Sequence, residues 1–83
     1  MIWYLYILKC RDGSLYTGIT IDLIRRIKEH NNMTGAKSLR GKLPVELVYK
    51  EEYPSQIEAA KRERNIKSWK REYKLKLVER SKP

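Results

Sequence analysis

The feature that most constrains the fold is a pair of apolar, alternating segments separated by a short turn. The period of a β-strand runs through Ile2 to Lys9 and again through Leu15 to Ile19, with Arg11-Asp12-Gly13 between them. Both faces of the first segment are mostly apolar, so we expect it to be the central strand of a sheet. The two segments predict an N-terminal β-hairpin.

The length of the turn sets the register of this hairpin, and two lengths fit the sequence. A two-residue Asp12-Gly13 turn sends Tyr6 and Tyr16 to opposite faces. A three-residue loop over residues 11–13, with the glycine in the left-handed conformation of a bulge, pairs Tyr6 with Gly18 instead. We expect this second register because it gives glycine the position that needs it. Tyr6 and Tyr16 then share one face, and Gly18 opens space beside a phenol.

Two helices and one more strand are expected after the hairpin. Thr20 or Asp22 can cap a first helix that ends at about Asn31. The alternation of residues 45–50 predicts the third strand, and Ser55 begins a second helix with a capping box.

The C-terminal residues Trp69, Tyr73 and Leu77 recur at every fourth position. This spacing predicts a last helix, or a continuation after a bend, that packs its aromatic side inward rather than presenting a base-stacking platform. Eighty-three residues predict one domain over 1–83. The expected fold class is α+β, with a three-stranded antiparallel sheet made of the hairpin and the third strand, flanked by two to three helices.

The chain is strongly basic, and its charge is uneven. Lysine and arginine outnumber the acidic residues by 19 to 10, and residues 53–83 hold ten basic and four acidic side chains. Such an excess attracts a polyanion through counterion release, so nucleic acid is the leading candidate partner and a solvated basic surface is the alternative. The expected contacts are Lys37, Arg40 and Lys42 in the long connection after the first helix, and Lys67.

Cysteine usage and hydropathy indicate the compartment. Cys10 is the only cysteine, so no intramolecular disulfide can form, which suits a reducing compartment. The apolar run from Met1 to Leu8 is too short for a membrane span and has no basic leader, so it is interpreted as a strand. We expect a cytoplasmic protein with no membrane segment.

Arg26 and His30 are four residues apart, so they share one side of the first helix, while Arg25 and Glu29 can pair farther out in solvent. Glu63 falls near the middle of the apolar face of the second helix, where a carboxylate is costly unless it is paired or bound to metal. A salt bridge, for example to an arginine, is the simpler expectation for Glu63, and a metal ligand is the alternative.

Together these side chains could supply what cleavage of a nucleic-acid backbone requires. Phenols and an imidazole can transfer protons, a guanidinium can clamp a phosphate, and a carboxylate can bind a metal ion. The candidate site residues are Tyr6, Tyr16, Arg26, His30 and Glu63.

The order and spacing of these motifs resemble the GIY-YIG nuclease family, in particular its small stand-alone bacterial members. Tyr4-Leu5-Tyr6 stands where the first triplet belongs, with Tyr4 in place of glycine, and Tyr16-Thr17-Gly18 stands for the second. Asp22 to Asn31 follows the pattern of the family's first helix, and Arg62 to Lys67 looks like its metal-binding helix. The likeness covers nearly the whole chain.

The resemblance implies a metal-dependent endonuclease that hydrolyses DNA phosphodiester bonds in DNA repair or processing, with RNA as another possible substrate. It implies one Mg²⁺ or Mn²⁺ ion held by Glu63, and an Arg26 that clamps the scissile phosphate. Tyr6 or Tyr16 would position and deprotonate the attacking water, and His30 is the alternative base.

Two other functions stay open at this point. One is a non-catalytic nucleic-acid-binding module that kept the fold. The other is a nuclease subunit that is nearly inert until a separate targeting protein brings it to DNA. A monomer is expected, because one metal site would most simply nick one strand.

Overall fold

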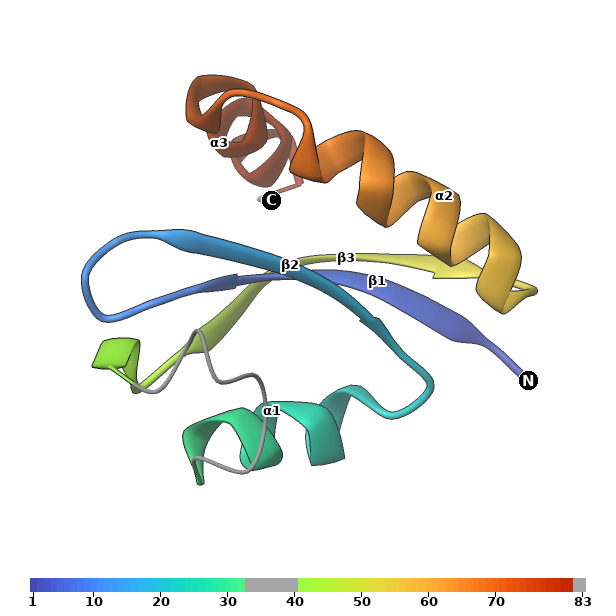
Figure 1. Cartoon of the computed structure of the whole chain (residues 1–83), viewed down its shortest axis with the longest axis horizontal. Coiled ribbons are helices and arrows are strands. Elements are labelled where there is room, and N and C mark those ends of the chain that lie inside the picture. Colours follow the sequence, from blue (N-terminus) through green and yellow to red (C-terminus); the bar gives the residue numbers. More distant parts are fainter. Residues whose placement is uncertain (33–40, 82–83) are drawn as a thin grey trace.

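The computed structural model describes residues 1–32 and 41–81, and it contains one antiparallel sheet between two helical layers (Figure 1). In chain order the elements are β1 (Trp3–Lys9), β2 (Leu15–Thr20), α1 (Leu23–Asn31), β3 (Glu46–Tyr53), α2 (Gln56–Lys67) and α3 (Arg71–Arg80). The strand order is β2-β1-β3, so β1 is central. Helix α1 covers one face of the sheet, and α2 and α3 lie on the other (Figure 1). The predicted α+β class is confirmed. None of the helices in the described ranges is long and apolar enough to cross a membrane.

The hairpin has the three-residue loop and the register that the sequence predicts. Gly13 has a φ of 87°, in the left-handed region, and its N–H donates to the carbonyl oxygen of Cys10 at 2.9 Å. Tyr6 is paired with Gly18 across the two strands. Tyr6 and Tyr16 therefore pack together on the side of the sheet that α1 covers.

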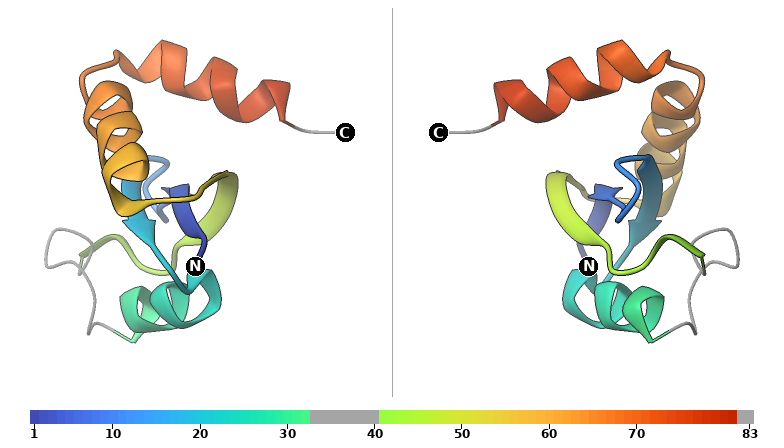
Figure 2. Two further views of the ribbon diagram at one scale, coloured as in Figure 1. Left: turned by 90° about the vertical axis from the view of Figure 1, so that its right-hand side faces the viewer. Right: turned by 90° about the vertical axis from the view of Figure 1, so that its left-hand side faces the viewer.

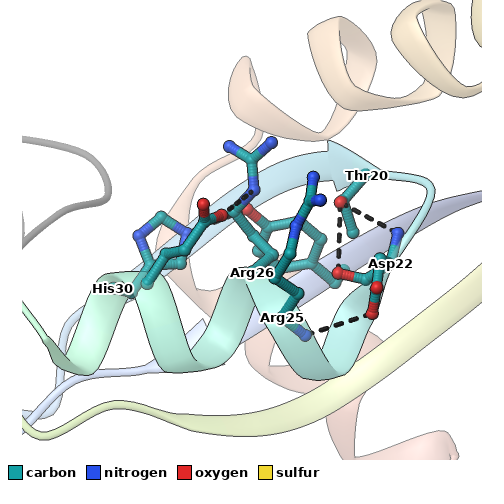
Figure 3. Close-up of polar contacts among 7 residues, drawn as sticks. Thr20, Asp22, Arg25, Arg26 and His30 are labelled. Carbon is teal, nitrogen blue, oxygen red and sulfur yellow. Dashed lines mark hydrogen bonds and ion pairs between the residues drawn. The ribbon is translucent and has the colours of Figure 1, made fainter.

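Helix α1 begins at a side-chain cap. Asp22 Oδ1 accepts the backbone N–H of Arg25 at 3.1 Å, so Asp22 rather than Thr20 is the N-cap (Figure 3). Thr20 supports this cap, since its Oγ1 accepts the N–H of Asp22 at 3.1 Å. The two candidate cap residues, Thr20 and Asp22, therefore have distinct roles at the start of α1.

The C-terminal end of α1 is joined to the segment before β3 by an amide. Asn31 Oδ1 accepts the N–H of Val45 at 2.8 Å, and Asn31 Nδ2 donates to the carbonyl oxygen of Val45 at 3.3 Å. Val45 is buried against the core that includes Tyr6 and Leu8. This pair of hydrogen bonds holds the returning chain beside α1.

Strand β3 extends three residues beyond its predicted end at residue 50 and carries a partly buried carboxylate, Glu51. Glu51 accepts hydrogen bonds from Arg62 Nε and Nη2, both at 3.0 Å, from the Tyr53 hydroxyl at 2.6 Å and from the Tyr49 hydroxyl. Burial alone would raise the pKa of Glu51, but these donors outweigh it and hold that pKa below its usual range. Glu51, a charged residue that the sequence suggests lies beyond the strand, therefore joins β3 to α2 through Arg62.

Helix α3 departs from the expected inward packing. Val78 is buried with Leu5, Ile7 and Ile66, and Trp69 packs against the same core. Tyr73, in contrast, is 51% exposed, so the expectation that the whole aromatic side turns inward is wrong for this residue.

We predict that Glu51→Gln lowers the free energy of unfolding by about 2–4 kcal/mol at pH 7, because it removes the charge that Arg62 pairs with. Urea denaturation measures this. Glu52→Gln is the matched control, since Glu52 is the exposed neighbour on the opposite side of β3.

The same measurement carries a pH test. The pKa of Glu51 is depressed in the folded state, so its contribution is complete above the unfolded-state pKa of about 4.3 and is lost as the pH falls below that value. The stability difference between wild type and Glu51→Gln should shrink in acid; a constant difference from pH 7 to pH 3 would contradict this role.

Candidate active site

Three of the candidate site residues form one aromatic cluster. The Tyr6 hydroxyl lies 3.0 Å from His30 Nε2 in a buried hydrogen bond. The Tyr16 ring meets the His30 ring edge-on, with centroids 5.4 Å apart, and the Tyr6 and Tyr16 centroids are 6.3 Å apart. Residues from β1, β2 and α1 thus meet at one place.

Gly18 makes this cluster possible. A Cβ atom at position 18 would lie 2.6 Å from the Tyr6 hydroxyl oxygen and 3.2 Å from Tyr16 Cε1. The register places this glycine directly opposite Tyr6. The phenol therefore lies across β2 in space that any other residue would fill.

Burial keeps both members of the hydrogen bond neutral. Burial, reinforced by the nearby Tyr16 and Glu63, raises the pKa of the Tyr6 phenol well above its ordinary value, although Arg26 partly opposes the shift. Burial also lowers the pKa of His30, and the positive charge of Arg26 lowers it further while Glu29 opposes this. At neutral pH the bond joins an uncharged phenol to an uncharged imidazole.

Arg26 supplies positive charge beside this neutral pair, one helical turn before His30 (Figure 3). Its side chain is 39% exposed and forms an ion pair with Glu29 Oε1 at 3.4 Å. The expectation that Glu29 pairs with Arg25 is therefore wrong. Within the described part of the chain, the buried Arg26 Nε has no hydrogen-bond partner. This Nε is nevertheless the atom that faces Glu29, and the guanidinium carries further N–H donors that can bind an anion.

Glu63 approaches the cluster from α2. Its side chain is 24% exposed, and Lys67 Nζ lies 3.4 Å from Glu63 Oε2. The expected salt bridge is present, with a lysine as partner. The charge of Glu63 raises the pKa of Tyr6, and Lys67 Nζ lies 6.0 Å from the centroid of the Tyr16 ring. From the helix on the opposite face of the sheet, Lys67 therefore comes near the Tyr16 ring, and the charge of Glu63 acts on the Tyr6 phenol.

The donor set fits a hard divalent cation with few protein ligands. Among residues 1–32 and 41–81, no group of three or more His, Cys, Asp or Glu side chains could hold a metal ion. Mg²⁺ usually keeps several waters and binds through one or two carboxylates and a substrate phosphate. Glu63 is partly exposed and engaged by a mostly exposed lysine, so it can act as such a single carboxylate.

The remaining predicted nucleic-acid contacts lie in different places. Lys37 and Arg40 fall outside the described residues. Lys42 lies by the hairpin turn, where its carbonyl oxygen accepts the N–H of Arg11 at 2.8 Å. The pKa of Asp12 in this turn is lowered mainly by hydrogen bonds from Ser14 and to a smaller extent by the charge of Lys42. Of these predicted contacts in the described part, only Lys67 is beside the tyrosine cluster.

The sequence analysis missed the contacts that fix the part of α2 that carries Glu63. Arg62 immediately precedes it, and the bidentate contact of Arg62 with Glu51 fixes this part of α2 against β3. The Arg62 guanidinium also lies over the Trp69 ring, 5.2 Å from its centroid. The available signal was the alternation of Tyr49, Glu51 and Tyr53, which indicates a polar group on an inward-facing strand.

This fold and arrangement match a known class of protein. The model of the GIY-YIG catalytic domain matches residues 2–76. The chain belongs to the GIY-YIG family, a family of nucleases, and its relatives are the UPF0213 proteins, a small stand-alone group.

The relatives cover nearly the whole chain. A UPF0213 protein of Staphylococcus saprophyticus is 52% identical over 75 residues, which are 90% of this chain and 92% of the relative. One of Clostridium perfringens is 55% identical over 75 residues, covering 90% and 81%. The solution NMR structure of a UPF0213 protein from Bacillus halodurans has 46% identity and a TM-score of 0.64, covering 98% of this chain and 86% of the other. That of an E. faecalis protein has 37% identity and a TM-score of 0.66, covering 95% and 84%.

We predict that Gly18→Ala destabilises the protein by about 1–3 kcal/mol, because the new methyl group displaces the Tyr6 phenol. Urea denaturation and the NMR signals of the His30 ring report the two effects. Gly41→Ala is the control, since a Cβ there meets nothing within 4 Å. Equal behaviour of the two variants would contradict the close contact.

The chain has a single histidine, so His30 can be titrated by NMR without assignment. We expect its pKa below the ordinary value of about 6.5. Arg26→Gln should raise this pKa because it removes a positive charge, whereas Arg25→Gln should leave it nearly unchanged. A wild-type midpoint at or above the ordinary value would rule out the neutral pair.

Proposed function

We propose that this protein is an endonuclease that hydrolyses DNA phosphodiester bonds by direct attack of water, with one Mg²⁺ or Mn²⁺ ion. The observation that carries the proposal is the partly exposed guanidinium of Arg26, a charged donor beside a neutral Tyr6–His30 pair. An anion with several oxygens, such as a phosphodiester, complements that donor. DNA repair or processing is the proposed setting.

Arg26 binds the scissile phosphate. Its guanidinium is held near the cluster by the ion pair with Glu29, and 39% of the side chain is open to solvent, where a substrate can approach. A planar guanidinium presents two aligned donors, so it can stabilise the charge that gathers on the phosphate oxygens during attack.

Tyr16 contacts the attacking water in this proposal. Tyr6 and His30 are almost completely buried and bonded to each other, whereas Tyr16 is only partly buried. The raised pKa of Tyr6 also keeps that phenol protonated, so it holds almost no phenolate that could accept a proton. A phenol accepts the proton of water only in its phenolate form, and Lys67 is the cation next to the Tyr16 ring. Tyr6 and His30 then hold the Tyr16 ring in place.

Glu63 would hold the metal ion, with waters and a phosphate oxygen as further ligands. When bound, a divalent ion neutralises phosphate charge and makes water a better nucleophile. Glu63 is available for this because its partner Lys67 is 53% exposed. The net charge of +9 draws the DNA backbone to the protein.

The test is cleavage of labelled duplex, single-stranded and branched DNA with Mg²⁺, Mn²⁺ or EDTA. We expect metal-dependent cutting that falls roughly 100-fold or more in Arg26→Ala and Glu63→Gln. Tyr16→Phe should lose more activity than Tyr6→Phe. Arg25→Ala is the matched control for Arg26, and it should cut nearly as well as wild type.

Binding to the same DNAs separates catalysis from affinity. Glu63→Gln should keep salt-dependent binding, because the basic surface is unchanged. If wild type and all variants bind DNA equally but none cuts any substrate with either metal, the protein is a binding module and the proposed chemistry is wrong. Cutting that appears only when cell extract is added would instead identify a subunit that needs a targeting partner.

A further inference from the structure

A groove lies along α3, on the face of the sheet opposite α1. Figure 2 shows α3 leaving the end of α2 and extending away to one side. The groove has a volume of about 430 Å³, within the range of roughly 300–1,000 Å³ that is usual for ligand sites. Its lining residues are Trp69, Tyr73, Lys76, Leu77 and Arg80.

Aromatic rings in this groove are more exposed than core packing requires. Tyr73 is 51% exposed, although Leu77, one turn later on α3, and Trp69, in the connection before α3, are partly buried against the core. Lys76 Nζ lies 5.5 Å from the centroid of the Tyr73 ring. Arg62 lies over Trp69, but its guanidinium is already paired with Glu51, so it holds the indole in place. The groove thus offers two positioned rings beside the Lys76 ammonium group.

The charge of the groove selects its partner. Among the described residues that line it, two are cationic and none is a carboxylate. A partner that fits must therefore present negative charge and flat apolar faces at the spacing of neighbouring side chains. Unpaired nucleotides do this, because phosphates alternate with exposed base faces, whereas a duplex hides those faces in its stack.

We propose that this groove binds an unpaired stretch of DNA, with bases stacked on Tyr73 and Trp69 and phosphates contacting Lys76 and Arg80. The inference rests on the proposed function only for the choice of DNA as the ligand. The binding itself requires neither the metal ion nor cleavage. It gives the nuclease a preference for DNA with a single-stranded segment.

The test is fluorescence anisotropy without metal, using a labelled oligothymidine strand and a duplex of equal length. Tyr73→Ala should weaken single-strand binding roughly 5- to 100-fold, the usual effect of losing one stacking ring, and should change duplex binding little. Leu75→Ala is the matched control, since Leu75 is a 37% exposed residue of α3 that does not line the groove. Lys76→Ala should weaken binding and reduce its salt dependence, whereas Lys74→Ala should do so less.

Tryptophan fluorescence locates the bound strand. Trp3→Phe leaves Trp69 as the single indole, and stacking on it should quench its emission as oligothymidine is added. Binding without quenching, or a Tyr73→Ala affinity equal to that of Leu75→Ala, would overturn the proposal. Tyr73→Ala should weaken single-strand binding by the same factor in the Arg26→Ala background as in wild type. Loss of cleavage with intact groove binding therefore separates failure of the catalytic proposal from failure of this one.

Discussion

The geometry of the site depends on one backbone conformation, the left-handed Gly13 in the hairpin loop. A loop shorter by one residue would move every side chain of β2 to the opposite face. The observed register instead puts Tyr16 beside Tyr6 and leaves Gly18 as the gap that the Tyr6 phenol occupies. Arg71 reinforces this loop, since its Nη2 donates to the Gly13 carbonyl oxygen at 2.7 Å. A single turn therefore orients the aromatic half of the site.

The free-energy cost of burying a charge explains why the site residues differ so much in burial. A buried charge is costly without a partner, and Tyr6 and His30 avoid that cost by being neutral at the ordinary working pH. The charged groups, Arg26 and Glu63, keep part of their side chains in solvent and have a counter-ion nearby. Glu51 is less exposed, at 17%, and it accepts hydrogen bonds from Tyr49, Tyr53 and Arg62. Neutral groups thus form the interior of the site, and ions form its rim.

Local signals in the sequence were enough to predict the hairpin, the central strand and the helix caps, because Gly13, Asp22 and Ser55 act through neighbouring residues. The meeting of Tyr6, Tyr16 and His30 followed from register and helical spacing. What could not be predicted depends on contacts distant in sequence. The role of Glu51 requires Arg62, eleven residues away, and the exposure of Tyr73 depends on how α3 leaves α2. The periodicity of apolar residues identifies which face of a helix or strand is apolar, but not which other element packs on that face.

The position of the aromatic cluster along the chain has a consequence for folding. Tyr6 and His30 are separated by 24 residues, so closing the loop between them costs less entropy than bringing Glu63 to the same place. Contacts of short sequence separation also tend to form first. During synthesis the phenol–imidazole cluster can assemble while the C-terminal third is still on the ribosome. The carboxylate joins only when α2 has been made and packed, so the two halves of the proposed site depend on different parts of the chain.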